Sequence, residues 1–188
     1  QVTAVPVIDP SLPPATVSLA GVAVNGDRVL LEPGDPSAER AIFRALEEAT
    51  TAMALSTVAT CRTIFETTLQ YAKDRQQFGK PIGAFQSLSH YLADAVTRVD
   101  GAEILVHEAA WARAIGRPVD QLAPMAKLFA DQTFRDVTAI AQQIWGGVGF
   151  TLEYDIQLFF RRAKAMQLNW WDARHLEDLV ADQVLSGV

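Results

Sequence analysis

The sequence is poor in cysteine, with Cys61 as the one cysteine among 188 residues. A single thiol cannot form a disulfide within the chain, and this usage is typical of proteins in a reducing cytoplasm, where we expect this one to work. No secretory signal precedes the first predicted strand. Gln1 is not an initiator residue, so we expect the sequence to be the C-terminal part of a longer protein.

Positive charge and long apolar runs are scarce as well. The chain holds 16 Lys and Arg against 22 Asp and Glu, with a formal net charge of -6 at pH 7. Without a basic cluster we expect no nucleic-acid partner. No apolar run approaches the ~20 residues that cross a bilayer, so we expect no membrane span. Three histidines, His90, His107 and His175, show no metal-ligand spacing, and we predict no metal site.

Apolar residues make up half of the chain and recur at helical spacing in long segments, which predicts a mainly α fold with a large core. Three stripes carry the pattern: Ile42, Leu46, Ala49, Met53, Cys61, Phe65, Leu69 and Ala72; Leu88, Leu92, Val96, Val99, Val106 and Ala110; and Leu122, Met125, Phe129, Val137, Ile140 and Ile144. Two shorter helices are predicted at 153–167 and 172–185. Short connections between them favour an antiparallel bundle of the four-helix type with about five helices.

Capping and helix-breaking residues set the expected boundaries of these helices. Asp35 followed by Pro36 predicts an N-cap with proline in the first turn, and this first helix should run to about Arg75. The second should stop at the Gly-Arg-Pro run of 116–118, and the third at the glycine pair 146–147.

The first 31 residues lack a helical period. Asn25 and Gly26 favour a tight hairpin turn between the alternating runs that contain Val22 and Val29, so we predict a short β-hairpin there. A hairpin of this size is not stable alone and should rest on β structure outside this sequence or on a partner. Residues 32–36 are predicted to be a linker.

The run R-Q-Q-F-G-K-P-I-G-A-F-Q over 75–86 separates the first two helices. Gly79 and Pro81 cannot continue a helix, so the chain must reverse here. The polar side chains of Arg75, Gln77 and Gln86 are more than a simple reversal requires. The run resembles the R-x-x-F-G-x-x-I-x-x-x-Q signature of the acyl-CoA dehydrogenase family, in its C-terminal helical domain.

A second run, Q-I-W-G-G-V-G-F over 143–150, is similar to the Q-x-x-G-G-x-G-[FY] segment of the same family. Its glycines allow a ligand to approach the backbone at a helix end, although glycine runs also simply end helices. The preceding element is predicted to be helical, which excludes a Rossmann loop. By this resemblance, residues 1–34 would be the end of a middle β-domain with its linker, and 35–188 the C-terminal helical bundle domain.

The resemblance implies a cofactor, FAD, and a site shared between subunits. In the family the arginine of the first motif reaches the pyrophosphate of the neighbouring subunit's FAD, a role that falls to Arg75 here. Taken alone, Arg75 could equally balance a helix dipole, and Phe78 and Phe85 could be core residues. Two motifs in the expected order favour the cofactor interpretation. The expected cofactor-contacting residues are Arg75, Gln77, Phe78, Phe85, Gln86, Gln143, Gly146 and Gly147.

The catalytic carboxylate of the family has no counterpart at its usual position. Most members carry a glutamate shortly after the second motif, where this chain has Trp170, followed by Trp171 and Asp172. A minority place the glutamate on the first long helix, where this chain has Ala49 with Glu48 beside it. A neighbouring residue points about 100° away on a helix, so we predict no catalytic residue in this chain.

The resemblance is therefore to the base-less subunit of bacterial α2β2 acyl-CoA dehydrogenases, several of which act on steroid side-chain CoA thioesters. The expected partners are a homologous subunit that supplies the glutamate, an acyl-CoA substrate and an electron-transfer flavoprotein. Two alternatives stay open. The chain could be a self-sufficient dehydrogenase with Glu48 or Asp172 as an unusual base, or a non-catalytic assembly subunit without flavin.

Overall fold

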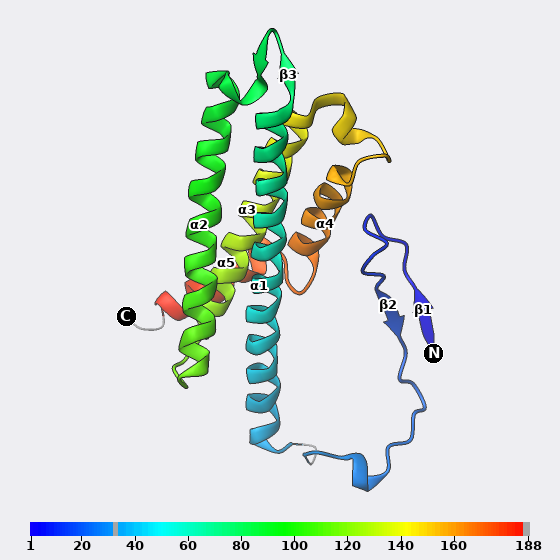
Figure 1. Ribbon diagram of the computed structural model, residues 1–188. Helices are drawn as coiled ribbons and strands as arrows, with labels where there is room; N and C mark the ends of the chain where they lie inside the picture. The colour runs from blue at the N-terminus through cyan, green and yellow to red at the C-terminus, as the bar shows by residue number, and fades with distance from the viewer. Residues whose placement is uncertain (32–33, 186–188) are drawn as a thin grey trace.

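The computed structural model describes residues 1–31 and 34–185, and over these ranges the chain is mainly helical (Figure 1). The helices are α1 (Pro36–Asp74), α2 (Gln86–Ala114), α3 (Leu122–Trp145), α4 (Ile156–Leu168) and α5 (Ala173–Leu185). A small antiparallel sheet precedes them. The predicted fold class, five packed helices after a short β element, is confirmed.

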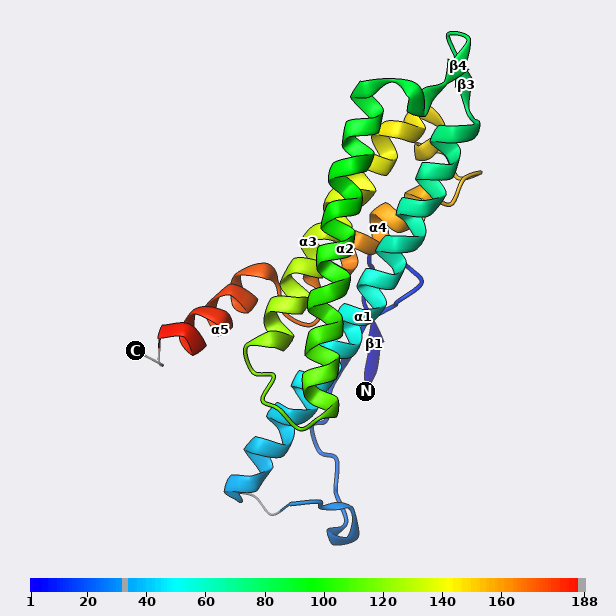
Figure 2. The ribbon, with the colours of Figure 1, turned by 60° about the vertical axis from the view of Figure 1, so that its left-hand side comes forward.

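Helices α1 to α4 alternate in direction and lie side by side, as the short connections predict (Figures 1 and 2). Helix α3 packs against α1, α2 and α4, and α5 joins the assembly through α3. Beyond that contact, α5 projects away from the bundle axis (Figure 2). None of the helices within the described part of the chain is both long and apolar enough to cross a bilayer.

Helix α1 begins and ends where its sequence predicts. The Asp35 carboxylate accepts a hydrogen bond of 2.8 Å from the Ser37 amide, with Pro36 in the first turn, and Arg75 is the C-cap. Its 39 residues give a length of about 58 Å. The first turns extend past the neighbouring helices, so Ile42, predicted to face the core, is 60% exposed (Figure 2).

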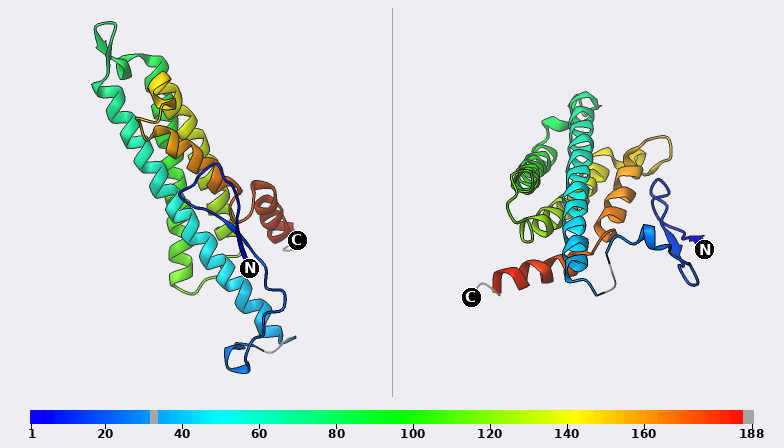
Figure 3. Two further views of the ribbon diagram at one scale, coloured as in Figure 1. Left: turned by 90° about the vertical axis from the view of Figure 1, so that its right-hand side faces the viewer. Right: turned by 90° about the horizontal axis from the view of Figure 1, so that it is seen from below.

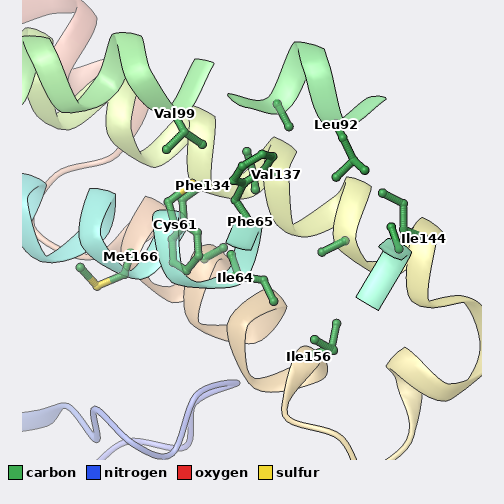
Figure 4. Close-up of a cluster of buried hydrophobic side chains, with 14 residues drawn as sticks. Cys61, Ile64, Phe65, Leu92, Val99, Phe134, Val137, Ile144, Ile156 and Met166 are labelled. Carbon is green, nitrogen blue, oxygen red and sulfur yellow. The ribbon is translucent and has the colours of Figure 1, made fainter. Parts of the chain in front are cut away.

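The main core lies between α1, α2, α3 and α4. Figure 4 shows side chains such as Ile64 from α1, Val99 from α2, Phe134 from α3 and Met166 from α4 converging on one another, and all four are buried. Helix α1 also buries threonines, among them Thr50, against its apolar neighbours. A buried threonine on a helix can satisfy its own hydroxyl by donating to the carbonyl four residues back, which explains why the apolar stripe alone underestimates the buried face.

The N-terminal hairpin was predicted at the wrong place. Strand β1 (Val2–Ala4) pairs with β2 (Ala15–Val17), and Val2 lies opposite Val17. At the expected turn, Gly26–Arg28 form a short 3-10 helix, and Asn25 has an ordinary φ of -68° instead of the positive angle of a tight hairpin turn. Of the predicted linker, Glu32 and Pro33 lie outside the described residues.

The N-terminal segment lies beside α4 (Figure 3), and two arginines of α4 hold it there. The Arg161 guanidinium donates to the Ile8 carbonyl at 2.7 Å. Arg162 forms an ion pair with Asp9 and a hydrogen bond to the Ser11 hydroxyl. The sheet itself is exposed, so these contacts are what fix the segment to the helices.

Candidate functional site

The run 75–86 forms a tight hairpin at one end of the bundle (Figure 1). Strand β3 (Gln76–Gln77) pairs with β4 (Lys80–Pro81), and a 3-10 turn, Ile82–Ala84, leads into α2. The Ile82 amide donates to the Arg75 carbonyl at 2.9 Å and closes the hairpin at its base. We call residues 75–86 the tip hairpin.

The turn of the tip hairpin holds an aromatic residue in a strained conformation. Phe78 has a φ of 55° and Gly79 a φ of 78°, so both central residues take the positive angles that a two-residue turn requires. This conformation is uncommon for a bulky side chain and is typical of functional positions. The Phe78 ring is 91% exposed and meets the Phe85 ring edge-on at 6.1 Å between centroids.

The polar side chains of the tip hairpin are open to a ligand. Within the described residues, the Arg75 guanidinium has neither an ion-pair nor a hydrogen-bond partner. The Gln77 amide donates only to the adjacent Gln76 carbonyl, at 2.7 Å, and Gln86 is exposed at the start of α2. The Lys80 ammonium lies 4.1 Å from the centre of the Phe85 ring. The hairpin therefore presents one unpaired cation with aromatic and amide groups around it.

An aromatic stack brings the second motif to the same end of the bundle. The rings of Tyr71 in α1 and Trp145 in α3 are parallel within 10°, with centroids 3.9 Å apart. Tyr71 precedes Arg75 by one helical turn, and Trp145 directly precedes Gly146. The structure thus places the tip hairpin beside the glycine segment, as the two motifs together predict.

The glycine segment borders an open cleft. Gly146 ends α3 with a φ of 64°, and a side chain added at Gly147 would meet open space. The cleft has a volume of about 430 Å³ and is lined by Ala139, Gln142, Gln143, Gly146, Gly147, Phe150 and Phe160. Gln143 is exposed, while Gln142 is buried and its side-chain oxygen has no hydrogen-bond partner among the described residues. Bare backbone at Gly147 leaves room for a flat ligand, such as the adenosine part of FAD, whereas the Gln142 oxygen packs against Gly149 inside the turn.

The two positions that the resemblance assigns to the family's glutamate, 170 and 49, lie close together in space. The indole nitrogen of Trp170 donates to the Thr50 hydroxyl at 3.0 Å, and Thr50 directly follows Ala49 in α1. Trp170 and Trp171 have φ angles of 60° and 79°, two consecutive bulky residues in the left-handed region. We call residues 169–172 the tryptophan turn. At this spot the side chains are an indole and a hydroxyl, and neither can accept a proton from a thioester α-carbon at neutral pH.

The acidic side chains near this spot have other partners. Glu48 forms an ion pair with Arg113 of α2. The Asp172 carboxylate accepts a hydrogen bond of 3.0 Å from the His175 amide and so caps α5. Partial burial, with the nearby Asp120 charge, raises the pKa of Glu47, which lines a groove at the α2–α3 connection.

The tip hairpin and the tryptophan turn are too far apart to form one pocket. Thr50 and Arg75 are 25 residues apart on the same helix, which places them on the order of 37 Å apart along its axis. A small-molecule pocket of ~300–1,000 Å³ is on the order of 10 Å across. The two features therefore cannot line the same pocket of one chain.

The sequence patterns did not identify Thr50 and Gln142. Thr50 is next to the counted position 49, and only the packing of the tryptophan turn on α1 shows it as the partner of Trp170. Gln142 directly precedes Gln143, the glutamine of the second motif. Only its buried side-chain oxygen, which has no hydrogen-bond partner among the described residues, distinguishes it. No three His, Cys, Asp or Glu side chains of residues 1–31 and 34–185 are grouped to hold a metal ion.

A helical bundle with an exposed arginine hairpin beside a glycine segment is the arrangement that the resemblance to the C-terminal domain of flavin-dependent acyl-CoA dehydrogenases implies. Residues 40–169 match the family of the acyl-CoA dehydrogenase C-terminal domain. The chain belongs to the acyl-CoA dehydrogenase family, whose members are FAD-dependent oxidoreductases.

Individual relatives agree with this assignment. The chain is 40% identical over 111 residues to acyl-CoA dehydrogenase IpdE2 of Mycolicibacterium smegmatis, covering 59% of this chain and 34% of that protein. It is 31% identical over 177 residues to benzylmalonyl-CoA dehydrogenase of Aromatoleum aromaticum, covering 94% and 46%. Among solved structures, a glutaryl-coenzyme A dehydrogenase bound to glutaryl-CoA superimposes with a TM-score of 0.87 at 25% identity, over 99% of this chain and 47% of that one. The chain thus spans less than half the length of the relatives it matches.

Proposed function

We propose that this chain is one subunit of a heteromeric, flavin-dependent acyl-CoA dehydrogenase, in which it completes the FAD site of a homologous partner. The partner would supply the catalytic glutamate. Residues 1–34 would be the end of a middle β-domain, and the assembly would be an α2β2 tetramer in the cytoplasm.

One observation carries this proposal: Trp170 is hydrogen-bonded to Thr50, next to Ala49, and positions 170 and 49 are the two that the resemblance assigns to the catalytic glutamate. At the other end of α1, the tip hairpin keeps an unpaired Arg75 and an exposed, strained Phe78. If the active site is shared between two subunits, one subunit can lose its own catalytic base and still keep the hairpin, because the hairpin serves the partner's site. The separation of the two features along α1 supports the same arrangement.

The residues of the tip hairpin fit the role of holding a diphosphate. The Arg75 guanidinium offers a planar fork that matches paired phosphate oxygens, and among the described residues no carboxylate is paired with it, because the adjacent Asp74 accepts from Gln70 instead. Gln77 and Gln86 would donate to polar groups next to the diphosphate, and Phe78 and Phe85 would exclude water from it. Gln143, Gly146 and Gly147 would border the adenosine half.

The chemistry supplied by bound FAD in this family is acceptance of a hydride from the thioester β-carbon, while a carboxylate removes the α-proton. Here the carboxylate would come from the partner, because the tryptophan turn offers none. The proposed substrate is an acyl-CoA, with steroid side-chain thioesters as the class suggested by the resemblance. The proposed electron acceptor is an electron-transfer flavoprotein.

The alternatives find less support in the contacts of the acidic residues. Glu48 is paired with Arg113 and Asp172 caps α5, so neither is a free carboxylate in a dry pocket. A flavin-free assembly subunit would have no use for an exposed Arg75 beside a strained Phe78.

The test is co-expression of the full-length chain with a homologous acyl-CoA dehydrogenase subunit that carries the catalytic glutamate, followed by measurement of bound flavin and of acyl-CoA oxidation with an artificial electron acceptor. We expect activity only in the pair. Arg75→Ala should weaken FAD binding by about 1.5–3 kcal/mol, the usual contribution of a hydrogen bond to a charged group. Lys73→Ala, which removes a neighbouring exposed cation from α1, is the matched control and should leave FAD binding unchanged.

Three outcomes would contradict the proposal. Full activity of the isolated chain, lost in Glu48→Gln or Asp172→Asn, would show a self-sufficient enzyme. A pair whose flavin content is the same with and without Arg75 would show an assembly subunit. Equal losses in Arg75→Ala and Lys73→Ala would show a general effect of positive charge.

A further inference from the structure

A fully buried lysine lies in the bundle where neither motif predicts a function. The Lys127 side chain, on α3, is 1% exposed, and its ammonium forms an ion pair with Asp131 one turn later on the same helix. Lysine is almost never fully buried without partners, because removing its charge from water is costly. The contacts of the Lys127 ammonium must therefore explain why this side chain is buried.

The contacts of this pair join three helices. The Lys127 ammonium donates to the Met166 carbonyl of α4 at 3.2 Å, and the Thr57 hydroxyl of α1 lies 3.4 Å from the Asp131 carboxylate. Burial raises the pKa of the Asp131 carboxyl, and the Lys127 ammonium opposes that rise. We call Lys127, Asp131, Thr57 and the Met166 carbonyl the buried polar cluster.

The carbonyl that Lys127 holds belongs to the last turn of α4. The carbonyls of a final helical turn have no partners within the helix, and a cation close to them is favourable. Met166 precedes the tryptophan turn by three residues. In an unbroken helix its carbonyl would accept from the amide of Trp170, but Trp170 has already left the helix with a φ of 60°.

We propose that Lys127 is a positioning residue: its ammonium ends α4 at a fixed point and thereby sets Trp170 and Trp171 in their left-handed conformation over α1. Two consecutive bulky residues at positive φ persist only where their surroundings hold them there. The Thr50 hydroxyl fixes the Trp170 ring from one side, and the buried polar cluster fixes the backbone from the other.

This inference deepens the proposed function, since the tryptophan turn occupies the place of the family's glutamate. In the proposed assembly, the buried polar cluster would keep two indoles in the space that a thioester would otherwise enter. The positioning itself concerns this chain alone and can be tested without flavin, partner or substrate.

The experiment is 19F NMR of the full-length chain labelled with 5-fluorotryptophan. The resonances of Trp111, Trp145, Trp170 and Trp171, the four tryptophans of these 188 residues, are each assigned by a single Trp→Phe substitution. In Lys127→Met we expect the Trp170 and Trp171 resonances to shift or broaden, while those of Trp111 and Trp145 stay in place.

Two further variants keep the test decisive if Lys127→Met does not fold. The double variant Lys127→Met with Asp131→Leu removes both buried charges, and Thr57→Val removes only the hydroxyl contact at 3.4 Å. We expect a clear displacement of both resonances in the first and a smaller one in the second. Val137→Ala, a cavity in the same helix away from the cluster, is the control and should leave the Trp170 and Trp171 resonances unmoved.

The proposal is overturned if no folded variant of the cluster moves the Trp170 and Trp171 resonances. It is also overturned if all four resonances move alike, or if Val137→Ala displaces these two as strongly, because either result indicates general loosening. None of these outcomes bears on flavin binding or on activity of the pair. Failure of this inference is therefore distinguishable from failure of the proposed function.

Discussion

The Trp170 indole donates a hydrogen bond of 3.0 Å to the Thr50 hydroxyl, across 120 residues of sequence. The Thr50 hydroxyl in turn donates to the Leu46 carbonyl at 2.7 Å, one turn back in α1. A hydroxyl can accept and donate at once, so both bonds form together. The contact ties the tryptophan turn to the N-terminal half of α1.

Replacing this hydroxyl should loosen the tryptophan turn. We expect Thr50→Val to lower the free energy of unfolding by about 0.5–1.5 kcal/mol, the net value of one hydrogen bond, and to make tryptophan fluorescence more sensitive to acrylamide. Urea titration and quenching measure the two effects. Thr63→Val removes a similar back-bond on exposed α1 surface and should change neither quantity by much; equal effects in both variants would refute the role of Thr50.

The Lys127–Asp131 pair should respond differently to single and double substitution. Lys127→Met leaves a buried carboxylate without its cation, and we expect a loss of about 3–5 kcal/mol in the free energy of unfolding. Adding Asp131→Leu removes the unpaired buried charge and should recover most of the lost free energy of unfolding. Urea titration of the three proteins gives the comparison, and additive losses would be inconsistent with a coupled pair.

The attachment of the N-terminal segment should depend on pH. Burial by itself would raise the pKa of Asp9, but hydrogen bonds from Ser11 and Arg162 outweigh it and lower the pKa below the ordinary value of 3.8. A carboxyl with a lowered folded-state pKa stabilises the attached segment above pH 3.8, and that stabilisation is lost as pH falls through the lower value.

Hydrogen exchange read by mass spectrometry, corrected for intrinsic rates, can check this dependence. At pH 7, Asp9→Asn should increase exchange in residues 1–18, whereas the two proteins should converge once the pH falls below the lowered pKa of Asp9. Asp27→Asn, in the same N-terminal segment but outside the α4 contacts, serves as the control. A gap between wild type and Asp9→Asn that persists at the lowest pH would contradict the prediction.

The buried thiol should be inert in the folded chain. Burial raises the pKa of Cys61 to about 12, with the nearby Arg62 acting in the opposite direction and Glu103 adding to the rise. Because the thiolate is the reactive form, we expect no reaction of the native chain with a disulfide reagent at pH 8. In urea one thiol per chain should react; rapid labelling without denaturant would show that the core between α1 and α2 opens readily.

Helix boundaries were predictable because single residues set them. Asp35 and Pro36 begin α1, and Gly146, with its positive φ, ends α3. The resemblance assigns both motifs to one cofactor, and the Tyr71–Trp145 stack brings them to the same end of the bundle. Local sequence rules predict a structural feature wherever the backbone conformation of a single residue determines it.

The remaining features depend on contacts between distant segments. Asn25 and Gly26 favour a tight turn, but Val22 and Val24 are exposed and have no paired strand, since β2 pairs with β1 instead. Buried Thr50 and Lys127 look like surface residues in the sequence, and only the packing of α4 and its following turn shows otherwise. Strand pairing and buried polar contacts are not encoded in local spacing.

The length of α1 between Thr50 and Arg75 limits which insertions and deletions homologous chains can accept. Each residue inserted or deleted in that stretch would rotate the tip hairpin by about 100° and shift it by about 1.5 Å relative to the tryptophan turn. Only changes close to whole turns would keep both ends facing their neighbours. Homologous subunits should therefore tolerate substitutions at the exposed positions of this stretch of helix but rarely gaps.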